Sequence, residues 1–199
     1  MNTVNQVGIY NMALGAVGVS RFIQSLQDTS VQAQTCNVFW ESVRDQCLSD
    51  YPWNFATRFT ALQKVDKHTP GWSRTYALPS DCLAARRIVH NHPLEPKIPF
   101  QVVEDEDNGR LCLATNGCSP VLEYTARVVK YTIWSPSFVN AVHLLLATKI
   151  VSPLSSAPDK YGPLVGKAYE MAISKAGANS MNEGQERPEP ESELITIRG

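Results

Sequence analysis

The sequence lacks the features that would place its 199 residues in several special classes. No hydrophobic run is long enough to cross a bilayer, because the longest apolar stretch, residues 138–151, is short and contains His143 and Lys149. No basic residue precedes Arg21, and the apolar segment of a signal peptide is missing. The 18 Lys and Arg against 19 Asp and Glu leave a net charge of −1, which disfavours tight binding of DNA phosphates. We therefore expect a soluble protein made and kept in a cytoplasm.

Cysteine is sparse, and its spacing gives no disulfide framework. The five cysteines, an odd number, are Cys36, Cys47, Cys82, Cys112 and Cys118. Cys36 and Cys47 lie three helical turns apart, so we expect both to be small buried side chains on one helix face. A bridge between Cys112 and Cys118 is conceivable across a turn, but a reducing compartment favours free thiols.

The composition that is present is typical of a globular protein. Apolar residues make up 43% and charged residues 19%, with 11 Gly and 13 Pro. The length suits one domain, or one domain with an insertion. The periodicity changes from helical spacing to short strands after Pro52, and returns to helical spacing at Ser135. We therefore predict an α+β fold: an antiparallel helical bundle over residues 1–55 and 133–178, a small β-rich insertion over residues 56–132, and an extended C-terminal arm over residues 179–199.

Two helices are predicted before the strands. The first covers residues 4–17, and the second follows N-cap candidates at residues 28–30. The apolar stripe of the second helix consists of Cys36, Trp40, Val43, Cys47 and Tyr51. Its outward face is predicted to hold Asn37, Glu41, Arg44 and Asp45. Glu41 and Arg44 are expected to form a weak ion pair, and Pro52 to end the helix.

The middle region is predicted to form short strands bounded by turn residues. The strand candidates are residues 59–65, 84–90, 100–104, 110–114 and 121–131. The dipeptide Asn108-Gly109 tolerates positive φ, which predicts a β-hairpin. The acidic run 104–107 before this turn indicates a solvated hairpin end, with a cation site or a contact to a basic partner as alternatives.

Two further helices and an acidic arm complete the chain. Ser135-Pro136 suits the start of a helix that Pro153 is expected to end. The last helix is predicted over residues 158–176 or 163–176, with Gly177 as its stop. The arm is expected to be disordered when free, because residues 179–193 contain five glutamates, two prolines and almost nothing to bury. It ends in an alternating segment, residues 194–198, that could add a strand to another sheet or occupy a groove.

No motif in the sequence identifies an active site. Residues 162–168 approach a phosphate-binding loop, but the spacing is one residue short and Ala168 stands where Ser or Thr would bind the metal. His90 and His92 could form a partial metal site with Cys82, but no paired-cysteine motif supports it. His143 fits a hydrogen-bonded core histidine. We expect no catalytic residue, no metal and no cofactor, with a two-carboxylate glycosidase as the open alternative.

Two segments carry a resemblance to a known family. The first is Val43-Arg44-Asp45-Gln46-Cys47-Leu48 followed by Tyr51-Pro52-Trp53-Asn54-Phe55-Ala56-Thr57-Arg58, and the second is Tyr76-Ala77-Leu78-Pro79-Ser80-Asp81-Cys82-Leu83. With Ala13-Leu14-Gly15, Trp134-Ser135-Pro136-Ser137-Phe138 and the acidic arm, they resemble the head-to-tail adaptor of short-tailed bacteriophages. That family is also called tail tubular protein A or head–tail connector. The motif residues are Arg44, Asp45, Pro52, Trp53, Asn54, Phe55, Leu78, Pro79 and Asp81.

The resemblance implies a structural protein of the virion that is assembled in the host cytoplasm and lies at the head–tail interface. It implies a ring of twelve copies that joins the portal protein to the tail nozzle protein and extends the DNA channel, with a docking surface for tail fibres. Duplex DNA would pass through the lumen without sequence-specific binding. The near-zero net charge independently suits such a channel, because a basic lumen would retain DNA.

The arm and the motif residues receive different roles. We expect the arm to bind the portal through Glu186, Glu189, Glu191, Leu194, Ile195, Ile197 and Arg198, with Ile195 and Ile197 as apolar anchors. Trp53 and Phe55 are expected to fold back under the preceding helix. Asp81 is expected to accept backbone N–H groups in a tight turn. The motif therefore predicts a structural corner and not a reactive site.

Two other classes of function compete with this interpretation. A virion-associated cell-wall glycosidase would use carboxylates such as Glu104 or Glu123 as acid and base. A DNA-binding terminator or stopper would bind duplex DNA in a salt-sensitive way, which the net charge of −1 disfavours.

Overall fold

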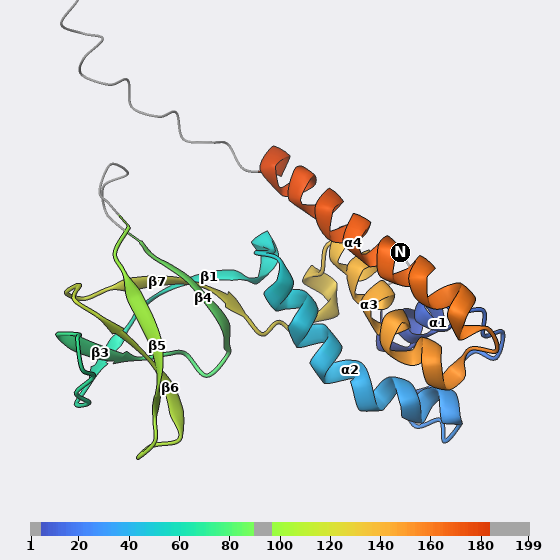
Figure 1. Ribbon diagram of the computed structural model, residues 1–199, viewed down its shortest axis with the longest axis horizontal. Helices are drawn as coiled ribbons and strands as arrows, with labels where there is room; N and C mark the ends of the chain where they lie inside the picture. Colours follow the sequence, from blue (N-terminus) through green and yellow to red (C-terminus); the bar gives the residue numbers. More distant parts are fainter. Residues whose placement is uncertain (1–4, 90–96, 184–199) are drawn as a thin grey trace, which may run out of the picture.

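The computed structural model describes residues 5–89 and 97–183, with side chains to residue 177. Helices α1 (Gln6–Ala16) and α2 (Val31–Asp50) precede the strands, and helices α3 (Pro136–Leu154) and α4 (Pro158–Glu183) follow them. The strands are β1 (Thr57–Ala61), β2 (Gln63–Val65), β3 (Arg74–Ala77), β4 (Cys82–Val89), β5 (Phe100–Asp105), β6 (Arg110–Thr115) and β7 (Val121–Ala126). Figure 1 shows the strands at one end of the molecule and the helices at the other. The predicted α+β class is confirmed.

The strands form two antiparallel sheets, a three-stranded one in the order β1-β7-β4 and a four-stranded one in the order β2-β3-β6-β5. The predicted single strand over residues 59–65 is wrong, because the chain passes from one sheet to the other at Leu62. The Leu62 N–H donates to the carbonyl of Pro120 at 3.0 Å, at the same crossing point. The predicted hairpin is confirmed: β5 pairs with β6, and Gly109 in the turn has φ 58°.

One strand was missed and another ends earlier than predicted, each for a local reason. The prediction missed β3, whose four residues include Arg74 and Thr75 and show too little apolar alternation to be noticed. Strand β7 ends at Ala126 and not at residue 131, because the chain leaves the sheet at Arg127 and forms a 3₁₀ turn at Tyr131–Ile133.

Helices α2 and α3 begin where the sequence predicts, whereas α3 and α4 end later than predicted. The hydroxyls of Ser30 and Ser135 cap α2 and α3 by accepting from backbone N–H groups at 3.3 and 3.2 Å. Helix α3 continues one residue past Pro153, because a proline in the last turn removes a single hydrogen bond. Helix α4 continues through Gly177, so the predicted stop is wrong and residues 179–183 of the predicted arm are helical. Gly177 instead lies against the ring of Tyr51, the residue that follows α2.

All four helices contribute to one hydrophobic core, which is rich in aromatic rings. Phe138 is fully buried at its centre, with ring centroids 4.7 Å from Trp134 and 5.1 Å from Trp53. Cys36 and Cys47 are buried on one face of α2, as predicted. His143 is also buried, and its Nδ1 lies 3.1 Å from the carbonyl of Val139, which confirms the predicted core histidine.

A second, smaller core lies between the two sheets. Its buried members come from both sheets and from the crossing at Leu62, and they are Leu62, Tyr76, Ile88, Leu113, Leu122, Tyr124 and Ala126. Helix α3 is the one helix in the described ranges with the length and apolarity to cross a bilayer. Its apolar residues are buried against the other helices, which accounts for its composition.

Candidate functional site

The corner between α2 and β1 contains the first motif segment. Helix α2 ends at Asp50, and Trp53 turns back beneath it, so that the indole Nε1–H donates to the carbonyl of Cys47 at 2.8 Å. The Trp53 side chain is buried, and Phe55 lies beside it with its ring centroid 5.1 Å from that of Phe138. The prediction that Trp53 folds back under the helix is confirmed, and Phe55 packs beside Trp53 against Phe138 of α3.

Arg44 and Asp45 form a polar cluster at the C-terminal half of α2. The prediction that Arg44 faces outward is wrong, because only 8% of the residue is exposed. Its Nε donates to Asp45 Oδ1 at 2.8 Å, so Arg44 pairs with Asp45 and not with Glu41 as expected. The second carboxylate oxygen of Asp45 accepts from Nε of Arg127 at 2.8 Å. Asp45 thereby connects α2 to the segment that follows β7.

The second motif segment forms the turn before β4. The N–H of Cys82 donates to the carbonyl of Pro79 at 3.0 Å, so a tight turn is present as predicted. The role predicted for Asp81 is wrong: its carboxylate accepts from the guanidinium of Arg58 and, at 3.2 Å, from the hydroxyl of Tyr124. Burial, reinforced by the adjacent carboxylate of Asp81, raises the pKa of Tyr124, so this hydroxyl remains a donor at neutral pH.

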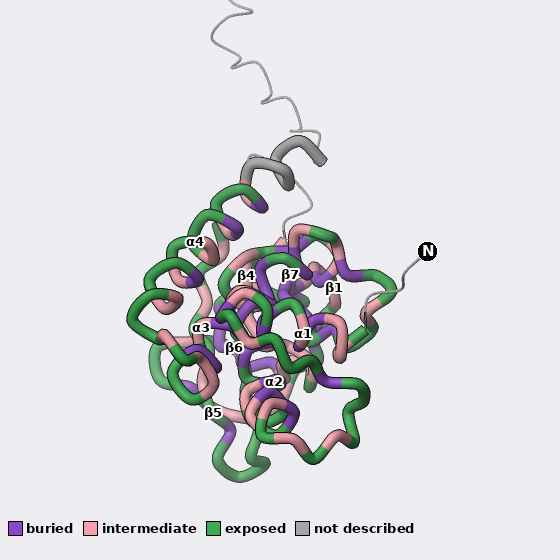
Figure 2. Tube along the Cα trace, turned by 90° about the vertical axis from the view of Figure 1, so that its right-hand side faces the viewer, coloured by how far each residue is buried: buried purple, intermediate pink, exposed green. Residues whose placement is uncertain are grey.

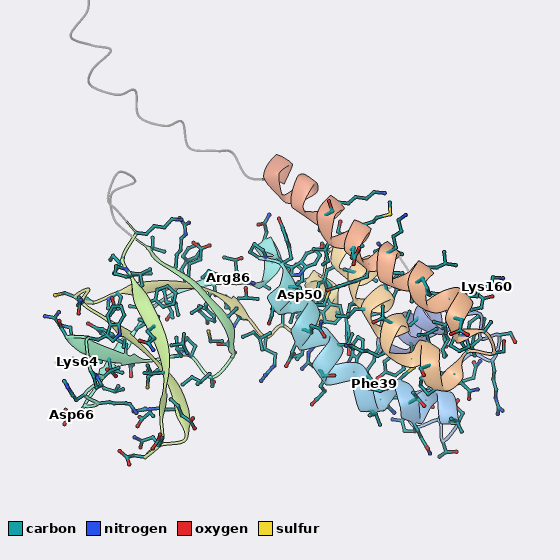
Figure 3. The ribbon with its side chains drawn as sticks, in the orientation of Figure 1. Phe39, Asp50, Lys64, Asp66, Arg86 and Lys160 are labelled. Atoms are coloured by element: carbon teal, nitrogen blue, oxygen red, sulfur yellow. The ribbon has the colours of Figure 1, made fainter. Side chains whose placement is uncertain are left out.

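Arg127 joins the two motif segments. Its backbone N–H donates to the carbonyl of Asp81 at 2.7 Å, while its guanidinium binds Asp45. Arg86 on β4 adds a parallel link, donating to Thr125 Oγ1 and to the carbonyl of Ser49 at the end of α2, both at 2.8 Å. Figure 3 shows Arg86 between the sheet and the end of α2, close to Asp50. We call this cluster of Asp45, Asp81, Arg86 and Arg127 the junction.

Arg86 and Arg127, the two residues that hold the junction together, were not predicted from the sequence. Each lies far along the chain from its partner on α2, and each stands in a strand region with several other arginines. No local spacing distinguishes them from solvated charges.

A shallow hollow of about 460 Å³ lies at the start of β1. It is lined by Pro52, Asn54, Thr57, Phe59 and Glu123. Phe59 is 60% exposed there, and Glu123 is held in an ion pair by Arg87. The carboxylates of Glu104 and Glu123, named as candidates for a glycosidase, lie on strands of different sheets.

The remaining residues considered for catalysis or ligand binding, the cysteines and the acidic run, do not form one site. Burial raises the pKa of Cys36 to about 12 and that of Cys82 to about 11, so both thiols are protonated at neutral pH. All five cysteines are free, including Cys112 and Cys118. The acidic run is not wholly solvated as expected, because Asp105 is buried and accepts from Arg110 Nε at 2.9 Å.

Metal-binding groups do not gather in the described part of the chain. Over residues 5–89 and 97–177, no three His, Cys, Asp or Glu side chains lie together as a metal site would require. His90 and His92 lie outside the described residues. The same holds for the predicted portal-binding residues Glu186, Glu189, Glu191, Leu194, Ile195, Ile197 and Arg198.

The site is therefore a hydrogen-bonded structural junction, and comparison with known proteins assigns it to no family. No protein-family model matches this chain, and no curated protein matches it.

Proposed function

We propose that this chain is the head-to-tail adaptor of a short-tailed bacteriophage, a structural virion protein and not an enzyme. In this proposal residues 1–55 and 133–178 form an antiparallel helical bundle, into which the β-rich residues 56–132 are inserted. Twelve copies form a ring between the portal protein and the tail nozzle protein. Duplex DNA passes through the ring without sequence-specific binding, and the outer surface offers a docking site for tail fibres.

The observation that carries the proposal is the meeting of the two motif segments at Arg127. These segments resemble the adaptor family. Both bond to Arg127, although more than thirty residues separate Asp45 from Asp81 in the sequence. A subunit of a ring needs a fixed angle between the parts that contact different neighbours. The junction supplies such a constraint, because it binds the end of α2 to the sheet β1-β7-β4 through charged hydrogen bonds.

Charge supports a channel through which DNA slides. The net charge of −1 leaves no excess of cations to hold phosphates. Within the described ranges, several arginines are also occupied by carboxylates: Arg44 and Arg127 bind Asp45, and Arg87 binds Glu123.

The test is the mass in solution of the purified chain, alone and after mixing with the portal protein from the same genome. We expect the chain to join a portal ring in twelve copies. A chain that ignores the portal contradicts the adaptor assignment. In that case a cell-wall zymogram tests the glycosidase, and duplex-DNA binding that weakens with salt tests the terminator or stopper.

The arm gives a sharper version of the same test. Replacing both Ile195 and Ile197 with Asp is expected to abolish portal binding while leaving the melting temperature of the chain unchanged, because both are proposed to insert as apolar anchors. Thr196→Asp is the matched control, since alternation places it on the other side of an extended segment. Portal binding by the double variant, or equal loss with Thr196→Asp, contradicts the anchor assignment.

A further inference from the structure

The outer surface of α4 presents a stripe of cationic and apolar side chains. Five exposed residues follow one another at intervals of three or four, which places them on one side of the helix: Lys160, Leu164, Lys167, Met171 and Lys175. Leu164 is 59% and Met171 52% exposed. The other side of α4 packs into the helical core through Val165, Ala172 and Ala176. Figure 2 shows the exposed outer side of α4. We call these five residues the α4 stripe.

The lysines of the α4 stripe do not face the acidic residues of their own helix. The acidic residues of the same helix portion, Asp159 and Glu170, lie about 100° around the helix from the stripe. Lys160 already contacts a ring, with its Nζ 5.3 Å from the centroid of Tyr161, and Figure 3 shows it near the start of α4. Within residues 5–89 and 97–177, neither Lys167 nor Lys175 has an ion pair. Two large apolar side chains between such cations fit a ligand that is both anionic and apolar.

We propose that the α4 stripe is the docking surface for the acidic C-terminal segment of the same chain, residues 184–197. This segment contains Glu186, Glu189, Glu191 and Glu193, and it ends in the apolar residues Leu194, Ile195 and Ile197. Glutamates match the lysines, and the apolar end matches Leu164 and Met171. Duplex DNA would use only the lysines and leave both apolar side chains in water, so the observations favour the segment.

The length of the segment suits this position. Lys160 lies 23 residues before the end of α4, which is about 34 Å along the helix at 1.5 Å per residue. The 16 residues after Glu183 span up to about 50 Å when extended. Pro188 and Pro190 favour an extended chain over a continued helix. A segment that folds back along α4 would bring Glu189 beside Lys175, Glu191 beside Lys167, and Leu194 beside Leu164.

Attachment to the same chain favours this contact over contact with another molecule. A short tether gives an effective concentration in the millimolar range, so weak ion pairs and a small apolar contact suffice. The contact would replace the disorder expected from composition alone. It does not depend on the proposed adaptor function. If a portal also binds this segment, the two surfaces compete for it.

The experiment is limited digestion of the full-length chain with a protease that cuts after glutamate, followed by the mass of the product cut after Glu193. Lys167→Glu combined with Lys175→Glu is expected to speed this cut about fivefold, because two surface ion pairs are lost. Added salt should speed the cut in the wild type, because it screens the same pairs. Lys149→Glu, the same substitution at one exposed lysine on α3, is the control and should leave the rate unchanged. Thermal melting checks that each variant is folded.

Charge reversal separates specific docking from a general effect of charge. Glu189→Lys combined with Glu191→Lys should also speed the cut after Glu193. Adding it to Lys167→Glu and Lys175→Glu should restore the slow rate. Equal rates in the wild type and the lysine variant overturn the proposal, as does an equal effect of Lys149→Glu. Protection that grows with protein concentration overturns docking within one chain, since an intramolecular contact is independent of concentration.

Discussion

The helical core contains Trp40, Trp53 and Trp134, whose rings contact one another or the shared ring of Phe138, whereas the core between the sheets contains no tryptophan. The fourth tryptophan, Trp72, is half-buried in the strand region, where its Nε1–H donates to Gln101. The helical region is thus held by a few large rings, and the strand region by more evenly distributed aliphatic side chains and by backbone pairing. Loss of one ring should therefore be felt more strongly in the helical region.

Charged contacts are arranged differently. Asp105 pairs with Arg110 within the strand region, and the pairs that Asp45 forms with Arg44 and Arg127 lie where α2 meets the sheet β1-β7-β4. Apolar burial stabilises each region, and charged hydrogen bonds fix the regions relative to each other. Substitutions in the cores and at the junction should therefore differ in kind as well as in size.

The largest effect is expected at the corner. Trp53→Ala should lower the free energy of unfolding by about 3–5 kcal/mol, because it leaves a cavity beside Phe138 and removes the donor to Cys47. The measurement is urea unfolding followed by circular dichroism. Phe59→Ala serves as the control, because Phe59 is largely exposed and its loss should change stability by less than about 0.5 kcal/mol. Similar losses in the two variants would show that Trp53 does not hold the corner.

A somewhat smaller effect is expected in the strand core. Leu122→Ala should cost about 3 kcal/mol, because Leu122 is fully buried on the central strand β7 between β1 and β4. Urea unfolding followed by tryptophan fluorescence, which reports mainly on the helical core, sharpens the comparison. If the junction couples the two regions, the fluorescence midpoint falls together with that from circular dichroism. An unchanged fluorescence midpoint would show that the regions unfold separately.

The same contrast explains how much of the structure the sequence predicts. Helix α2 was predicted with its stripe and both ends, because its apolar residues are close in sequence and repeat at the helical period. The strands were less well predicted, since β1 and β2 are almost continuous and only contacts with distant strands place them in different sheets. At the candidate site, Trp53 was predicted from its place after a proline. Arg127 was not, because its partners lie far away in the chain.

An intermediate effect is expected at the junction. Asp45→Ala should cost about 2 kcal/mol, because it removes the acceptor of Arg127 and leaves the buried guanidinium of Arg44 without its carboxylate. Arg127→Ala should cost less, about 1 kcal/mol, since nearly half of that side chain is exposed and solvent screens its pair. The measurement is urea unfolding of both variants and of Glu41→Ala. Glu41 was predicted to pair with Arg44, which pairs with Asp45 instead. A larger loss in Glu41→Ala than in Asp45→Ala would contradict the observed pairing.

The smallest effect on stability is expected on lowering the pH, and the helical and strand regions should lose stability in different pH ranges. Burial lowers the pKa of His143 in the helical core below its ordinary value of 6.5, so the stability it contributes is present above pH 6.5 and is lost as the pH falls below it. For Asp105 in the strand region, burial works to raise the pKa. The hydrogen bonds from Asn108 and Arg110 outweigh burial, and the pKa is lowered from 3.8. Its contribution is present above pH 3.8 and is lost only as the pH falls below that value.

Melting temperatures measured between pH 7 and pH 5 should therefore fall in the wild type and fall less in His143→Leu, whereas Asp105→Asn should follow the wild type over this range. Equal slopes for the wild type and His143→Leu would show that a group other than this histidine takes up the proton.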